Sequence, residues 1–343
     1  MTTPTRSRRL RTWSALGELG RVPSDYEIVT HGLNYTFRPG RASALESNPT
    51  APMNMWFLTY RDKSPLQADD WDGFRDPDEL TYRKYVTLQD EAETVAEKVL
   101  DEFDAVGHDR NLAPEWVRVL ATAFTPMRYP THGLQMCQAY LGLMAPSSYT
   151  QTACVFAAAD LLRRTTLTAY RARQLQMAHP AAGFVTGERR IWETDADWQP
   201  TRRAVEQALC AYDWGECLTA VNLVLRPTLE EVLLRQQALV ADANGDQLTW
   251  LLLSNLAADA ERAARWSAAL ARYAVAARPD NADVLGRWVD KWAPRADEAA
   301  AGLARMLAKL PAAGRDETLI LQAASAARSR VLAAAGLLAS PVR

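Results

Sequence analysis

Apolar residues recur with a helical period through most of this chain after residue 90. Between Asp90 and Val106, four apolar side chains stand four, four and three residues apart, which places them on one stripe of a helix: Val95, Val99, Phe103 and Val106. Because β-type alternation is almost absent, we predict an all-α bundle of long helices. The further predicted helices, separated or kinked by prolines, are Pro114–Phe124, Pro126–Met144, Ser148–Met177, Arg202–Val224, Leu229–Ala243, Gln247–Ala276, Asn281–Leu310 and Asp316–Ala339.

The segment before these helices, from Pro52 to Asp90, follows neither a helical nor a strand period, yet it holds seven aromatic residues in 39 positions. A solvated linker is poor in aromatic residues, because large apolar rings gain nothing by staying in water. We therefore expect residues 1–90 to form a long irregular arm whose rings are pinned against a surface, either the chain's own body or a partner. Residues 91–343 then form the helical domain, which ends in an Ala-rich helix.

Composition narrows the class of protein without identifying a partner. Lys and Arg total 39 against 41 Asp and Glu, so there is no electrostatic reason to expect nucleic acid or an anionic membrane as a partner. No apolar run reaches the roughly 18 residues of a membrane span, and we expect a cytoplasmic protein. The four cysteines form no C-x-x-C pair and lie in apolar surroundings, which predicts buried free thiols: Cys137, Cys154, Cys210 and Cys217.

A large helical bundle raises the question of a metal pair held by Glu residues and two Glu-x-x-His repeats. The residues three positions before the four histidines are Ile28, Ala105, Tyr129 and Gln176. None is a carboxylate, so the chain cannot supply that site. Nucleophile-elbow, P-loop, dinucleotide-binding and zinc-protease motifs are absent too. We predict no catalytic residue, no cofactor-binding residue and no metal ligand in this chain, and we interpret His132 as a hydrogen-bonded structural residue.

Two polar clusters stand inside predicted helices. Asp259 and Glu261 are expected to form helix-surface ion pairs with Arg262 and Arg265, because these residues are three or four positions apart. The cluster Asp213-Trp214-Gly215-Glu216 has two interpretations. It is a buried polar network that holds helices in register, which we favour, or it is a contact with a partner.

Short motifs of rare residues follow one another in a fixed order from about residue 11 to about residue 308. They are Arg11-Thr12-Trp13-Ser14, Pro23-Ser24-Asp25-Tyr26-Glu27-Ile28-Val29, Pro52-Met53-Asn54-Met55-Trp56, Tyr60-Arg61, Ser64-Pro65-Leu66, Trp71-Asp72, Asp76-Pro77-Asp78, Tyr82-Arg83, Arg128-Tyr129, His132, Leu134-Gln135-Met136, Ala139-Tyr140, Met144-Ala145-Pro146, Thr168-Ala169-Tyr170-Arg171, Asp213-Trp214-Gly215-Glu216, Asp259-Ala260-Glu261-Arg262 and Arg265-Trp266-Ser267. Together they closely resemble the beta subunit of the hydroxylase of bacterial multicomponent (soluble di-iron) monooxygenases, and most closely the toluene and alkene (isoprene) four-component type.

This resemblance implies a ferritin-like fold that copies the shape of the catalytic alpha subunit but lacks its iron ligands. If Asp259 marks the place of the Asp that precedes the second ligand repeat in alpha, Ala260 and Ala263 occupy the ligand positions. The resemblance also implies an α2β2γ2 hydroxylase with alpha and gamma subunits as partners and the di-iron centre in alpha. NADH, FAD and Fe-S clusters belong to other components, a reductase and a Rieske ferredoxin, and a small effector protein acts on alpha.

By the same resemblance, the arm lies across partner surface. The expected interface residues are Trp13, Tyr26, Trp56, Tyr60, Arg61, Trp71, Tyr82 and Tyr85. The alternative is that these rings cover the chain's own helices. We predict a noncatalytic structural beta subunit of a hydroxylase that oxidises alkenes or aromatic hydrocarbons with O2. Two other functions are weighed against it: a free-standing helical scaffold or binding protein, and an independent ferritin-like metalloenzyme, whose ligands are missing.

Overall fold

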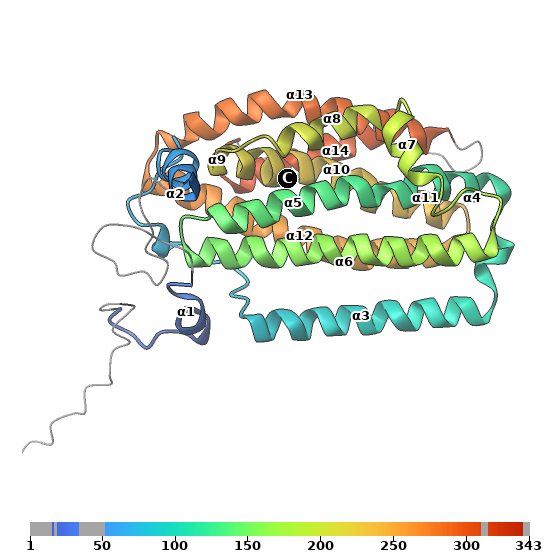
Figure 1. Cartoon of the computed structure of the whole chain (residues 1–343), viewed down its shortest axis with the longest axis horizontal. Helices are drawn as coiled ribbons and strands as arrows, with labels where there is room; N and C mark the ends of the chain where they lie inside the picture. Colours follow the sequence, from blue (N-terminus) through green and yellow to red (C-terminus); the bar gives the residue numbers. More distant parts are fainter. Residues whose placement is uncertain (1–15, 17–18, 34–51, 310–314, 339–343) are drawn as a thin grey trace, which may run out of the picture.

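The computed structural model describes residue 16 and residues 19–33, 52–309 and 315–338, and every regular element in this part of the chain is a helix. The predicted all-α class is confirmed for these residues. Long helices lie side by side, with α3 at one edge of the view in Figure 1 and α13 at the opposite edge. The α-helices are Asp25–Thr30 (α1), Pro52–Phe57 (α2), Tyr82–Ala105 (α3), Pro114–Val119 (α4), Arg128–Met144 (α5), Ser148–Ala178 (α6), Glu188–Thr194 (α7), Gln199–Ala208 (α8), Trp214–Leu218 (α9), Arg226–Glu230 (α10), Gln237–Ala243 (α11), Gln247–Ala277 (α12), Asn281–Ala308 (α13) and Glu317–Ala334 (α14).

Shorter helical turns of other types connect or interrupt these α-helices. Four of them are π-helical, and wider turns of this kind change the hydrogen-bond register within a longer helix: Leu58–Asp62 (η2), Leu120–Phe124 (η5), Thr219–Leu225 (η7) and Glu231–Gln236 (η8). Three are 3₁₀ turns: Trp71–Gly73 (η3), His108–Asn111 (η4) and Thr125–Met127 (η6). No helix of the described part is both long and apolar enough to cross a membrane.

Two helical hairpins form the centre of the bundle. In the first, α5 and α6 are joined by three residues and lie side by side in Figure 1. Ser147 begins α6 by accepting a hydrogen bond from the Thr150 N–H at 3.3 Å. In the second, the consecutive segments α9, η7, α10, η8 and α11 form one long helix, and α12 is the other arm of the hairpin. Side chains from both hairpins are buried in one shared core, and α13 and α14 pack on the second hairpin.

Two predicted helix boundaries are wrong, for reasons that the structure makes plain. The predicted helix over residues 202–224 is broken after Ala208, because Asp213 caps a new helix by accepting hydrogen bonds from the N–H groups of Gly215 and Glu216 at 2.9 and 3.0 Å. The expected break near Pro227 is absent, and the helix runs on. Pro227 stands in the first turn of α10 just after a π-helical segment, where a missing N–H is tolerated.

The expected irregularity of Pro52 to Asp90 is wrong at both of its ends. The first end contains α2 and η2, and the second belongs to α3, which begins at Tyr82. Thr81 starts α3 by accepting a hydrogen bond from the Lys84 N–H at 3.3 Å. The helical period is hard to see in residues 82–90, because only Tyr85 among them is buried. The division of the chain at residue 90 stays a prediction.

The irregular middle of the arm is docked on the helical body. The backbone of Gln67 exchanges two hydrogen bonds with the Asn281 side chain, at 3.2 and 2.7 Å. The Trp71 indole is only 4% exposed and meets the Trp214 ring edge to face at 5.0 Å. Gly215 makes room for this contact region, because a Cβ there would come within 2.8 Å of Leu66. The arm from residue 64 to residue 78 is therefore part of the fold.

We predict that Trp71→Ala destabilises the isolated chain itself. Removing a buried indole costs about 3–5 kcal/mol of unfolding free energy, and urea unfolding followed by circular dichroism measures it. Trp250→Ala is the control, because the Trp250 ring lies exposed on α12, and it should cost about 1 kcal/mol or less. Equal losses in the two variants would show that Trp71 does not belong to the core.

Candidate functional site

The structure places the predicted interface residues in three different environments. Four of them are buried within this chain: Tyr26, Arg61, Trp71 and Tyr85. Trp56 and Tyr60 are half-buried, and the Tyr82 ring is 76% exposed. Trp13 lies outside the described residues. For Tyr26, Trp71 and Tyr85 the rings cover the chain's own helices, which was the alternative interpretation. Contact with a partner stays a prediction for the half-buried and exposed rings.

The half-buried rings form a small aromatic cluster at the end of α2. The Trp56 ring lies 4.5 Å from Tyr60 and 5.0 Å from Tyr212, measured between ring centroids. The Trp56 Nε1–H donates to the Tyr140 hydroxyl at 3.0 Å, which ties α2 to α5. Met53 and Met55 stand exposed beside this cluster on α2. Exposed methionine and half-buried aromatic side chains of this kind are frequent at protein contacts.

A longer apolar surface runs along α6. Four apolar side chains on α6 are about half exposed or more and recur every seven or eight residues: Val155, Leu162, Tyr170 and Met177. Two helical turns contain about 7.2 residues, so these side chains form one straight stripe along α6.

A second stripe, with Met136, Ala139 and Leu143 exposed, lies on α5. The two stripes adjoin, because a Cβ at Gly142 on α5 would lie 3.1 Å from the Val155 side chain. We call this surface the α5–α6 face. Nothing in the described part of the chain covers it, and extended apolar surfaces of this kind mark interaction sites.

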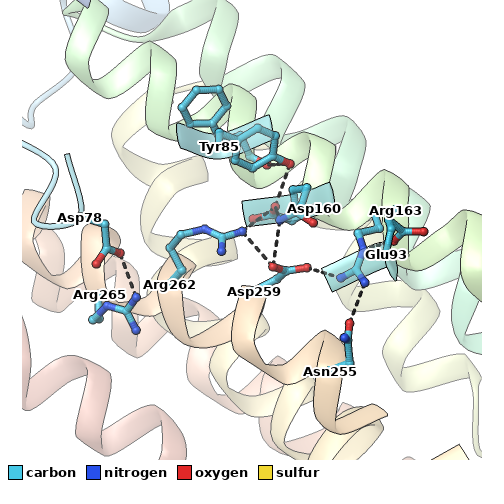
Figure 2. Close-up of polar contacts among 11 residues, drawn as sticks. Asp78, Tyr85, Glu93, Asp160, Arg163, Asn255, Asp259, Arg262 and Arg265 are labelled. Carbon is cyan, nitrogen blue, oxygen red and sulfur yellow. Dashed lines mark hydrogen bonds and ion pairs between the residues drawn. The ribbon is translucent and has the colours of Figure 1, made fainter. Parts of the chain in front are cut away.

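A buried charge cluster joins α3 to the two central hairpins (Figure 2). Asp160 of α6 and Asp259 of α12 both accept hydrogen bonds from Arg262 Nη2, at 2.7 and 2.9 Å. Arg163 Nη1 donates to Asp259 at 2.9 Å, and Arg163 also pairs with Glu93 of α3. The expected ion pair between Asp259 and Arg262 is confirmed at 2.9 Å, but both residues are buried rather than at the helix surface.

The remaining two members of the expected pairs, Glu261 and Arg265, do lie at the surface, but each finds another partner. Arg235 pairs with Glu261. Arg265 pairs with Asp78 of the arm at 2.9 Å (Figure 2). The spacing rule for helix pairs missed these contacts, because residues from other segments of the fold compete for the same charges.

Polar residues of α3 complete the buried cluster. The Tyr85 hydroxyl donates to Asp160 at 2.9 Å, and Gln89 Nε2 donates to Asp160 at 3.0 Å and to Asp259 at 3.1 Å. Burial, and secondly the neighbouring Asp259, raise the pKa of Asp160 to about 6, although Arg262 and Tyr85 oppose this shift. The cluster thus fixes the position of α3 on the bundle, although burial destabilises the ionised form of Asp160.

The cluster Asp213-Trp214-Gly215-Glu216 forms a network between elements, as the favoured interpretation held, but only Trp214 and Gly215 are buried, whereas Asp213 and Glu216 are half-buried. Asp213 accepts a hydrogen bond from the Ser64 hydroxyl at 2.8 Å as well as capping α9. Glu216 accepts hydrogen bonds from Lys291 Nζ at 2.5 Å and from the Trp292 indole at 3.0 Å. The network therefore connects the arm, α9 and α13.

The interior between the two hairpins is polar but does not resemble a metal site. Gln138 of α5 donates to Asn222 of η7, and Asn222 donates to the Ser267 hydroxyl of α12 at 3.0 Å. Nearby, Glu230 Oε1 accepts hydrogen bonds from Arg164 Nη1 at 2.9 Å and from Arg226 Nε at 3.0 Å. All of these side chains are buried.

These interior residues do not fit a di-iron centre. Amides and a hydroxyl are weak ligands for iron, and two guanidinium groups beside one carboxylate repel a divalent cation. Among the described residues, no group of three or more His, Cys, Asp and Glu side chains is arranged to hold a metal ion. Ala263 is buried on α12, and its carbonyl accepts a hydrogen bond from the Ser267 hydroxyl at 2.6 Å.

Sequence reasoning missed the interior arginines and carboxylates. The available signal was the presence of Asp160, Arg164, Arg226 and Glu230 at positions where the helical period requires an apolar residue. Two smaller expectations also need correction. Cys137, Cys154 and Cys217 are buried free thiols, but Cys210 is exposed at the end of α8. His132 is exposed on α5, and its ring forms no hydrogen bond with the described residues, contrary to its interpretation as a hydrogen-bonded structural residue.

Comparison with known proteins gives one consistent family. The family model described as methane/phenol/alkene hydroxylase matches residues 56–278. The beta subunit of the hydroxylase component of the toluene-4-monooxygenase system from Ectopseudomonas mendocina is 40% identical over 317 residues, which are 92% of this chain and 96% of that protein. The methane monooxygenase component A beta chain of Methylosinus trichosporium is 26% identical over 55% of this chain and 49% of that protein.

Solved structures agree with this family. A chain of toluene 4-monooxygenase, in a structure with toluene bound in the resting active site, superposes with a TM-score of 0.83 at 40% identity and covers 88% of this chain and 99% of that chain. A chain of phenol hydroxylase from Pseudomonas sp. OX1 superposes with a TM-score of 0.82 at 20% identity over the whole of both chains, which supports the fold alone. The predicted ferritin-like bundle is confirmed.

We predict that the buried charge cluster gives a pH-dependent stability with a defined sign. Because Asp160 has a higher pKa in the folded chain than in the unfolded chain, its contribution to stability is complete below about pH 4 and is lost as the pH rises through about 6. Asp160→Asn cannot titrate. The free energy of unfolding of this variant, relative to the wild type, should therefore increase between pH 4 and pH 7.

Urea unfolding from pH 4 to pH 7 measures this difference in unfolding free energy. A constant offset from altered packing around the amide does not affect how the difference changes with pH. Asp290→Asn, which removes an exposed carboxylate on α13, is the control for loss of one negative charge. A difference between Asp160→Asn and the wild type that stays constant from pH 4 to pH 7 would contradict the assignment.

Proposed function

Since this chain belongs to the methane/phenol/alkene hydroxylase family and is a hydroxylase beta subunit, we propose that it is the noncatalytic structural subunit of a di-iron monooxygenase that oxidises alkenes or aromatic hydrocarbons with O2. The relative that matches over nearly its whole length is named for toluene, which favours an aromatic substrate class. The chain's own contribution is to support the alpha subunit and to hold the hydroxylase together.

The α5–α6 face is the observation that carries this proposal. A stripe of exposed apolar side chains every two turns is the pattern by which one helix packs against another. In the isolated chain this stripe runs along the 31-residue α6 and continues beside it on α5. We infer that helices of the alpha subunit cover it. The aromatic cluster at Trp56 and Tyr60, and the exposed Tyr82, extend the proposed interface into the arm.

The interior of the bundle supports the division of labour between the subunits. Arginines and amides fill the space between the hairpins in which a ferritin-like enzyme holds its metals. The di-iron centre is therefore assigned to the alpha subunit, whose residues carry out the oxygen chemistry. This chain supplies no group to that chemistry.

The rest of the assembly follows from the family. We propose an α2β2γ2 hydroxylase with a gamma subunit as the third chain. Electrons from NADH reach it through a reductase carrying FAD and a Rieske ferredoxin, and a small effector protein acts on the alpha subunit. A free-standing scaffold protein is the remaining alternative, and it requires a monomer that is stable with the α5–α6 face in water.

We predict that the double substitution Leu162→Glu and Tyr170→Glu abolishes assembly with the alpha subunit. Each new carboxylate would be buried without a partner at the interface, at a cost of about 3 kcal/mol or more, so the affinity should fall more than about a hundredfold. Co-expression of a tagged chain with its alpha subunit, followed by affinity purification, measures the yield of complex. Circular dichroism of the purified variant checks that the helices are retained.

The matched control is Leu319→Glu on α14. Leu319 is 50% exposed and Leu162 is 51% exposed, so the two sites differ in position rather than in burial. The control should co-purify as the wild type does. If the Leu162 and Tyr170 variant assembles normally while its fold is intact, the α5–α6 face is not the interface.

A further inference from the structure

A pocket with a volume of about 570 Å³ opens on one side of the bundle. It is formed by α12, α14 and the continuous helix made of η7, α10 and η8. None of its lining residues comes from α5 or α6, so it is separate from the α5–α6 face. On α12 its wall extends from Ala257 to Arg272, which corresponds to about 22 Å along the helix axis. Pro77 of the arm lines it as well. The volume is within the range of small-molecule sites, and the shape is elongated.

The wall of this pocket is apolar and made of small residues. Alanines of α12 and α14 leave the space that larger side chains would fill, and Val331 adds further apolar surface: Ala257, Ala260, Ala263, Ala264, Ala268, Ala269, Ala327 and Ala334. Ala260 and Ala264 are half-buried one turn apart on α12. This wall favours the alkyl or aryl part of a ligand, because apolar surface gains free energy when it leaves water.

Charged residues line the same pocket with an excess of cations. Five arginines and three glutamates are among its lining residues: Arg226, Arg235, Arg265, Arg272, Arg330, Glu230, Glu231 and Glu261. Glu230 already accepts hydrogen bonds from Arg226 and Arg164, Arg235 pairs with Glu261, and Arg265 pairs with Asp78. These carboxylates are therefore largely engaged.

Two of the exposed arginines keep spare hydrogen-bonding capacity, and the buried Arg226 keeps Nη1 and Nη2 without a hydrogen-bond partner. Within the described residues, Arg272 donates to the Ala334 carbonyl at 3.3 Å and forms no ion pair. Arg330 reaches Glu231 only at 3.8 Å, with its side chain 62% exposed. Arg272 stands on α12 and Arg330 on α14, the two helices that supply the alanine wall. A guanidinium with free N–H groups is well suited to bind a carboxylate.

We propose that this pocket binds a chain-like carboxylate, with the carboxylate on Arg272 and Arg330 and the apolar body along the alanines of α12. The elongated apolar wall favours an extended hydrocarbon, and arginines with spare N–H groups favour an anion.

Calorimetric titration of the purified hydroxylase with dodecanoate, below the concentration at which it forms micelles, tests this proposal. We expect saturable binding of one dodecanoate per copy of this chain, with dodecanol and dodecyltrimethylammonium binding at least about tenfold more weakly. The double substitution Arg272→Gln and Arg330→Gln should weaken dodecanoate binding at least about tenfold. Ala264→Phe, which fills the pocket without changing its charge, should weaken it to a similar degree.

The control is the double substitution Arg118→Gln and Arg189→Gln, which removes two exposed arginines of α4 and α7 outside the pocket and should leave binding unchanged. Absence of saturable binding to the wild-type hydroxylase would overturn the proposal. So would binding that Ala264→Phe leaves intact, or dodecanol binding as tightly as dodecanoate. Binding to the isolated chain but not to the hydroxylase would show instead that another subunit occupies the pocket.

Discussion

Carboxylates inside a helical bundle need cations beside them, and in the centre of this bundle and where α3 packs on it the cations are arginine side chains. A buried charge without a partner costs several kcal/mol. Arg163 and Arg262 meet this requirement for Asp160 and Asp259 where α3 packs on the bundle, and Arg164 and Arg226 meet it for Glu230 in the centre. Arg163 and Arg164 of α6 and Arg262 of α12 each pair with a carboxylate on another helix, so these contacts fix the helix positions. Of these groups, Arg164, Arg226 and Glu230 lie between the two hairpins, where a ferritin-like enzyme holds its metals.

The long helices were predictable from sequence, because their apolar period continues over many turns. The ends of α5, α6 and α12 agree with the predicted ends to within about two residues, the usual uncertainty of helix boundaries. The errors fall where local signals compete with the fold. The cap at Asp213 breaks an apolar run, whereas the π-helical turns before and after α10 allow a helix to pass through Pro227.

The candidate site was only partly predictable, because aromatic residues of a core and of an interface look alike in sequence. Trp71 and Tyr85 meet Trp214 and Phe156 of their own chain, and the sequence offers no signal for those long-range pairs. The α5–α6 face was hidden for a different reason. A bundle helix that is apolar on two sides reads from its sequence as fully buried, so the sequence does not distinguish the exposed stripe from the core.

A tagged copy of the chain, purified from its own host, provides the most direct test of the subunit account through its native mass and iron content. The account predicts a hetero-oligomer in which this chain is accompanied by a larger chain and a small third chain, and in which iron stays with the larger chain when the subunits are separated. A lone monomer, or iron bound stoichiometrically by this chain alone, would contradict it.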